Sequence, residues 1–146
     1  IKKIVDNDNW VGFFAAKSLA GIEDKNIIKK IESYYDKVEQ NVKLAIIEVL
    51  GKCKGVDPSF LLSKLDDTNE DIRKEALNSL SLMHGPVALT AAIKLFNKDE
   101  SWLVRYKAVN IILEQKPVGY DNLLRARLKD ETNKYILEHI IGEIGE

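Results

Sequence analysis

Residues 70–80 read EDIRKEALNSL, and this stretch carries the pattern that decides the fold. Apolar side chains at Ile72, Ala76 and Leu80 are four positions apart, so they lie on one stripe of an α-helix. The positions between them are largely polar, as a solvent-facing surface requires. The stretch therefore predicts an amphipathic helix whose apolar stripe packs against a neighbouring element.

The same pattern recurs along the chain at intervals of 30 to 32 residues. Five segments carry it, and we call them the B helices: Val11/Ala15/Leu19, Val42/Ile46/Leu50, Ile72/Ala76/Leu80, Val104/Ala108/Ile112 and Ile136/Ile140/Ile144. A fixed period of this length is typical of repeat proteins, in which each unit buries its apolar stripe by stacking on its neighbours.

A second helical pattern precedes four of the B helices, and we call these segments the A helices. Apolar residues mark them: Ile27, Ile28, Ile31 and Tyr35; Leu61, Leu62 and Leu65; Leu89, Ile93 and Phe96; Tyr120, Leu124 and Leu128. Four glycines fall between repeats, where a positive φ or a close backbone approach is often required: Gly21, Gly55, Gly85 and Gly119. Polar runs at residues 6–9, 66–69, 97–100 and 129–132 precede the B helices and mark their caps.

These features predict an all-α fold, an α-α superhelix (solenoid) of about four and a half helix pairs. We expect residues 1–146 to form a single repeat domain. The chain begins at Ile1 without methionine, and residues 1–6 resemble the last turn of a helix. We therefore expect it to be a fragment of a longer solenoid.

The B-helix pattern resembles Asp-x-x-Val-Arg-x-x-Ala-x-x-x-Leu-Gly, which is typical of short HEAT-like repeats of the phycobilisome-lyase type. The closest copies are residues 70–80 and 102–112, and residues 42–51 match nearly as well. The first copy carries Gly12 and the last Leu137 where the arginine belongs. The resemblance covers essentially the whole chain and implies a scaffold, an adaptor, an assembly factor or, in some members, an enzyme.

Composition places the chain among ordinary folded proteins, with 45% hydrophobic and 31% charged residues. Its 22 Lys and Arg nearly cancel its 23 Asp and Glu, so no overall field attracts nucleic acid or an anionic membrane. The sequence has no apolar run of the roughly 20 residues that span a bilayer. The single cysteine, Cys53, forms no intramolecular disulfide, and we expect a cytoplasmic protein.

Lys43, Arg73 and Arg105 occupy the same slot of successive B helices. By resemblance they form a structural ladder with carboxylates of adjacent loops, such as Asp67 and Asp99, and link one repeat to the next. The alternative is a row of anion-binding residues. We favour the ladder, because a half-buried arginine is usually paired with a carboxylate.

Trp10 and Trp102 each stand at the start of a B helix. A large aromatic ring at this place can cover the end of the core, which is the interpretation that we favour. The alternative is an exposed pair that grips a partner.

Helix phase predicts which B-helix side chains face outward on the concave side of the solenoid. We expect this face to bind the partner, and its candidate residues are Lys17, Glu48, Glu75, Asn78, Lys107, Asn110, His139 and Glu143. Ser18, Val49, Ser79 and Ile111 fall on the same predicted face. Its mixed charge differs from the positive concave face of the HEAT-like alkylpurine DNA glycosylases. The basic runs at residues 25–30 and 125–129 belong to A helices, which by resemblance lie on the convex side.

Candidate catalytic residues are sparse. His139 and Glu143 are four residues apart on one helix and could face a metal ion. Deoxyhypusine hydroxylase, a HEAT-repeat enzyme, holds iron with several His-Glu steps, whereas this chain has one such site, in reversed order; His84 lies at a repeat junction. We treat Cys53 as a non-catalytic thiol, and we predict neither a metal nor a cofactor.

The sequence thus favours a non-catalytic protein–protein interaction scaffold or adaptor that binds another protein or a peptide segment. The alternative is a HEAT-fold enzyme component, either a chromophore-lyase-like subunit or a fragment of a metal hydroxylase. Nucleic-acid binding is a less favoured alternative.

Overall fold

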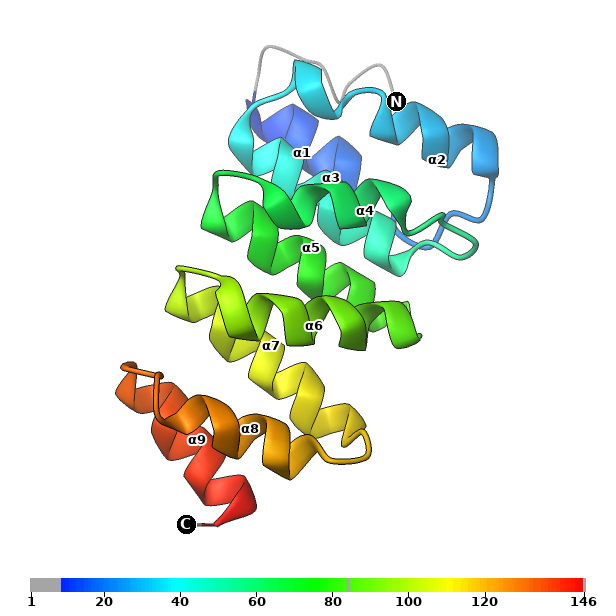
Figure 1. The fold of residues 1–146 in the computed structure, drawn as a ribbon. Helices are drawn as coiled ribbons and strands as arrows, with labels where there is room; N and C mark the ends of the chain where they lie inside the picture. The colour runs from blue at the N-terminus through cyan, green and yellow to red at the C-terminus, as the bar shows by residue number, and fades with distance from the viewer. Residues whose placement is uncertain (1–8, 84, 146) are drawn as a thin grey trace. The chain divides into compact units, whose positions relative to one another are not determined.

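The computed structural model describes residues 9–83 and 85–145, and in these ranges all regular secondary structure is helical (Figure 1). The predicted all-α fold of alternating A and B helices is therefore confirmed. The chain divides into two compact units, Ile1–His84 and Gly85–Glu146, each of which we describe by itself. The predicted helix turn at the N-terminus lies outside the described residues. No described helix has the length and apolar character that crossing a membrane requires.

In the first unit, three B helices form a row. These are α1 (Asn9–Lys17), α3 (Gln40–Lys52) and α5 (Glu70–Leu82), and α3 packs against both α1 and α5. The A helices are shorter, and each continues into a 3₁₀ turn: α2 (Lys25–Glu32) with η2 (Tyr35–Lys37), and α4 (Ser59–Ser63) with η3 (Lys64–Asp66). The first A helix packs on α3, and the second on α5.

The second unit contains two helix pairs (Figure 1). α6 (Pro86–Lys98) packs against α7 (Trp102–Gln115), and α8 (Tyr120–Leu128) packs against α9 (Lys134–Ile144). The two B helices, α7 and α9, also contact each other. A and B helices thus alternate along the chain in both units.

Side-chain caps fix where several helices begin. The Asn69 side chain accepts hydrogen bonds from the N–H groups of Asp71 (2.8 Å) and Ile72 (3.3 Å) at the start of α5. Asn133 makes the same pair of bonds at the start of α9. An N-terminal turn has N–H groups without helical partners, and such side chains satisfy them. The polar runs therefore set the register of the B helices that follow.

The predicted apolar stripes form the core of each unit. From α3 onward the stripe residues Val42, Ile46, Leu50, Ile72, Ala76, Leu80, Val104, Ala108, Ile112, Ile136 and Ile140 are at most 2% exposed. Ala15 and Ile144, near the two ends of the described chain, are half-buried. Each stripe is shielded from solvent because a neighbouring B helix of the same unit, or the paired A helix, packs against it.

α3 and α5 come unusually close at Gly51. A Cβ atom added there would lie 2.6 Å from the Cβ of Ser79 and 2.7 Å from its Cα. Ser79 is fully buried, and its hydroxyl donates to the carbonyl of Ile47 at 2.9 Å. The interpretation of Ser79, Val49 and Ile111 as outward-facing was wrong, because all three are buried.

The glycines between repeats do not all behave as predicted. Gly21, Gly55 and Gly119 adopt positive φ angles of 83°, 70° and 77°. Gly85 instead has a φ of −165° and caps the start of α6 in extended backbone, which any residue can adopt. An added Cβ at Gly85 would meet nothing within 4 Å, so neither expected reason for a glycine applies there.

Candidate functional site

An open groove of about 350 Å³ crosses the row of B helices in the first unit. α1, α3 and α5 all line it, with Phe13, Lys17, Leu44, Ala45, Glu48, Asp71, Lys74 and Glu75. Lys17, Glu48 and Glu75 belong to the partner-binding face that the sequence predicts. The structure thus brings together three of the expected residues from three helices.

Charges on the α1 and α3 side of the groove are tightly coupled. The Lys17 ammonium donates to one oxygen of Glu48, and Lys52 donates to the other oxygen at 2.6 Å. The hydrogen bonds from Lys17 and then Lys52 hold the pKa of Glu48 below its ordinary value. Lys17 also lies 5.5 Å from the ring centre of Phe13. Two cations therefore share one carboxylate at this end.

The α5 side of the groove is arranged differently. Lys74 pairs with Asp71 at 3.2 Å, one turn away on the same helix. Glu75 accepts a hydrogen bond from the neutral amide of Asn78 at 3.2 Å. Within residues 9–83, no lysine or arginine forms an ion pair with Glu75. This end of the groove therefore carries an unbalanced negative charge.

In the second unit, the predicted face has an aromatic surface on α7 and α9. The His139 Nε2 lies 2.8 Å from the Asn110 side-chain oxygen, to which it donates. The His139 ring lies 5.2 Å from that of Tyr106, and Trp102 lies 5.8 Å from Tyr135. Lys107 is half-buried and Glu143 is exposed.

The histidine has no metal-binding surroundings among the residues that the structure describes. In residues 9–83 and 85–145, three or more His, Cys, Asp or Glu side chains nowhere gather closely enough to hold a metal ion. His84 lies outside the described residues. Cys53 is buried, with its thiol 3.7 Å from the carbonyl of Leu19.

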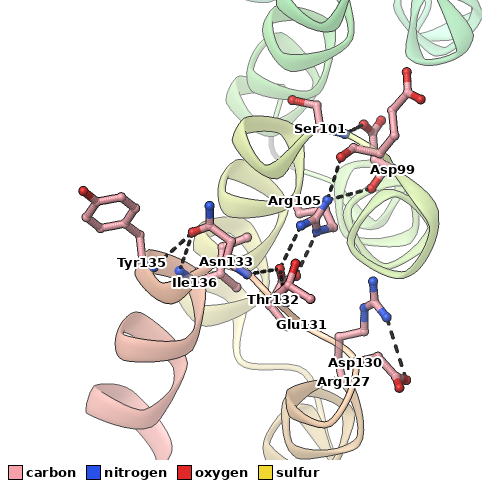
Figure 2. A network of polar contacts seen from close by, with 11 residues as sticks. Asp99, Ser101, Arg105, Arg127, Asp130, Glu131, Thr132, Asn133, Tyr135 and Ile136 are labelled. Atoms are coloured by element: carbon pink, nitrogen blue, oxygen red, sulfur yellow. Dashed lines mark hydrogen bonds and ion pairs between the residues drawn. The ribbon is translucent and has the colours of Figure 1, made fainter.

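Arg105 lies at the centre of a buried polar network (Figure 2). Its Nε and Nη2 donate to the two oxygens of Glu131 at 2.8 and 2.7 Å, and both side chains are almost fully buried. Its Nη1 donates to the carbonyls of Asp99 (3.0 Å) and Glu100 (2.9 Å). The guanidinium therefore joins two loops, the one before α7 and the one before α9.

Glu131 also caps the loop to which it belongs. Its Oε1 accepts hydrogen bonds from the N–H groups of Thr132 (3.0 Å) and Asn133 (2.9 Å). Burial alone would raise the pKa of Glu131, but the hydrogen bonds from Arg105 and from these N–H groups hold it below its ordinary value. The Arg105–Glu131 pair is therefore ionised at neutral pH, and its hydrogen bonds hold the two loops together.

Of the other two residues of the expected ladder, Arg73 resembles Arg105 and Lys43 differs from it. The Nη1 of Arg73 donates to the carbonyls of Asp67 (2.9 Å) and Thr68 (3.3 Å), as Arg105 does one repeat later. Lys43 departs from the expectation: its ammonium lies 5.2 Å from the ring centre of Tyr35, and no carboxylate in the described part of the chain pairs with it. An ammonium lacks the planar fork that lets arginine bind carbonyls and a carboxylate at once.

Trp102 is 39% exposed and lies on the ring of Tyr135, so it does not seal the core. The side chain of Trp10 lies outside the described residues. Of the basic A-helix residues, Arg125 is half-buried and donates to the carbonyl of Ile144 at 2.7 Å, so it serves packing in the second unit.

Sequence reasoning missed several residues of these surfaces. Phe13, Leu44, Asp71 and Lys74 line the groove, and Tyr106 and Tyr135 form the aromatic surface. Tyr106 and Tyr135 stand one helical turn before Asn110 and His139, so an i, i+4 search from the predicted residues would have found them. The groove residues depend on how three helices pack, which helix phase alone does not give.

Comparison with known proteins gives one family. A family model for HEAT repeats matches residues 58–145, which is more than half of the chain. The match does not distinguish the phycobilisome-lyase type from other HEAT repeats. A search of curated proteins finds no match.

Proposed function

Because the chain belongs to the HEAT-repeat family, we propose that it is a non-catalytic scaffold or adaptor that binds another protein on its B-helix surface. HEAT repeats commonly mediate protein–protein interactions. The observation that carries the proposal is the groove across α1, α3 and α5. We propose the cytoplasm as its location, since the lone cysteine is a buried free thiol.

The composition of the groove suits a protein segment. Phe13 and Leu44 offer apolar surface, and charged side chains of both signs surround them. Protein interfaces combine an apolar centre with a polar rim in this way. α3 and α5, which build most of the groove, are held by buried stripes, so binding requires little ordering of these two helices.

The proposed binding residues are those of the B-helix surface in each unit. In the first unit they are Lys17, Glu48, Glu75 and Asn78, and in the second Lys107, Asn110, His139 and Glu143. Arg73 and Arg105 are proposed as structural residues, because their guanidinium groups bind loop carbonyls.

The test is capture of a partner by the immobilised chain, followed by titration with that partner after purification. Glu75→Lys and Lys107→Glu should each weaken binding by about fivefold or more, because each changes the sign of a charge on the proposed surface. Lys29→Glu, on the exposed surface of α2, is the control and should leave affinity unchanged. Loss of binding in the control alone would place the interface on the A helices.

Glu48 is unsuited to this test. A lysine at position 48 would face both Lys17 and Lys52, so lost binding could reflect local unfolding. Arg125 is equally unsuited as an A-helix control, because it bonds to the carbonyl of Ile144.

A further inference from the structure

The groove of the first unit has charges of opposite sign at its two ends. At the boundary of α1 and α3, Lys17 of the groove lining and Lys52, one helical turn after Glu48 and outside that lining, share the single carboxylate of Glu48, which leaves an excess of one positive charge. On α5, Lys74 balances Asp71, while Glu75 contacts only the neutral Asn78 amide among its described neighbours. The groove is therefore positive toward α1 and negative toward α5.

Apolar surface lies between these ends. Leu44 belongs to α3, the middle helix of the row, and Phe13 adds an aromatic ring from α1. An apolar side chain of a ligand can rest here without losing hydrogen bonds, whereas an isolated charge could not.

We propose that this groove binds an extended peptide segment in which an acidic and a basic residue stand about three positions apart, with an apolar residue between them. The acidic side chain contacts Lys17 and Lys52, the apolar side chain covers Leu44, and the basic side chain pairs with Glu75. This inference rests on the proposed protein-binding function and names the chemistry of its ligand. Complementary charge at both ends sets the orientation of the segment.

Helix packing sets the spacing of the two charged ligand residues. Packed helices lie about 8–10 Å apart, and an extended chain advances about 3.3 Å per residue. A peptide therefore needs about three residues to reach from Glu48, at the edge of α3, to Glu75 on α5. A nucleic-acid strand fits less well, because Glu75 would repel its phosphates.

The experiment uses the ¹⁵N-labelled full chain and five synthetic nonapeptides with a central leucine. Two peptides carry Asp and Lys three positions apart, in either order along the chain. The other three carry Asp at both positions, Lys at both, or Asn at both. Backbone amide shifts report where each peptide binds, and titration gives its affinity.

One of the two Asp/Lys peptides should shift the amides of groove residues and bind about tenfold more tightly than the Asn peptide, since each surface ion pair contributes up to about fivefold. Glu75→Lys should remove this preference and favour the peptide with two Asp residues. The matched control is Glu138→Lys, at an exposed position of α9 outside the groove. This variant should rank the five peptides by affinity in the same order as the wild type. Circular dichroism checks that both variants remain folded.

Equal affinity for all five peptides, or amide shifts outside the groove, would overturn the inference. If Glu75→Lys still weakens the natural partner in that case, protein binding stands and only the ligand chemistry is wrong. If neither peptides nor partner respond to it, the proposed function fails in this unit as well. Amide shifts that vary with protein concentration without peptide would identify a second copy as the occupant and also overturn the inference.

Discussion

At the residue scale, the chemical nature of a cation, and not its position in the repeat, decides which contacts it makes. Arg105 and Lys43 occupy equivalent positions of their B helices, yet Arg105 binds two carbonyls and a carboxylate while Lys43 lies over Tyr35. The planar guanidinium can satisfy several buried acceptors at once, and an ammonium on a flexible stem cannot. Replacing each residue by alanine should therefore lower the free energy of unfolding by a different amount.

Arg105→Ala should lower the free energy of unfolding by about 3 kcal/mol, because it leaves Glu131 buried without its cation. Lys43→Ala should cost about 1 kcal/mol or less, the usual value of a cation–π contact near the surface. Urea unfolding followed by circular dichroism measures both. If the two variants are equally stable, the buried pair contributes no more than the surface contact.

Acid should weaken the Arg105–Glu131 pair in a defined direction. The folded-state pKa of Glu131 lies below its ordinary 4.5, so the folded chain binds this proton more weakly than the unfolded chain. The stabilisation is therefore complete above about pH 5 and is lost as the pH falls through the folded pKa. The stability difference between the wild type and Glu131→Gln should shrink from pH 6 to pH 3 in urea titrations. A difference that stays constant would show that charge is not involved.

At the element scale, the distance between neighbouring B helices depends on small residues at their crossing. Gly51 allows α3 to meet the backbone of α5 at Ser79. Small residues permit such an approach because nothing but hydrogen projects from the glycine Cα. Glycine inside a helix otherwise destabilises it, so Gly51 contributes through packing rather than through helix propensity.

Gly51→Ala should destabilise the chain by about 1–2 kcal/mol, since overpacking costs about 1–3 kcal/mol and the gain in helix propensity offsets up to about 1. Gly142→Ala in α9 is the matched control. An added Cβ there meets nothing within 4 Å, so we expect stabilisation by about 0.5–1 kcal/mol. Thermal unfolding of both variants decides the matter. A stabilised Gly51→Ala would mean that α5 moves aside without cost.

At the scale of the whole molecule, the near balance of 22 basic and 23 acidic residues limits what the chain attracts. Its charges vary locally, as the groove shows, while the sum gives no long-range field. Recognition should therefore depend on short-range complementarity.

The chain should not bind a labelled DNA duplex at 150 mM salt with a dissociation constant tighter than about 10⁻⁴ M, the weak limit for non-specific DNA-binding proteins. Fluorescence polarisation over a range of salt concentrations measures this. A micromolar affinity that falls steeply with salt would contradict it and would support the nucleic-acid alternative.

Much of the architecture was predictable at the level of single helices. The stripe at Ile72, Ala76 and Leu80 predicts a helix and its buried side, because i, i+4 spacing places these side chains together whatever the rest of the chain does. The polar run at residues 66–69 predicted the start of α5, which Asn69 caps, and the cap of α9, Asn133, directly follows the run at residues 129–132. The boundary between the two compact units coincides with a predicted repeat junction, although nothing in the sequence distinguished that junction from the others.

The sequence by itself thus determined the helices, their pairing and the family, since these depend on local periodicity repeated five times. Only the tertiary structure decided that Arg105 pairs with Glu131, that Ser79 is buried under Gly51 and that the groove residues converge. Helix phase predicts the direction of a side chain only to within a broad sector. Residues at the edge of an apolar stripe are therefore buried or exposed according to how closely the next helix approaches. Contacts between residues about 30 positions apart depend on that approach, which no single repeat encodes.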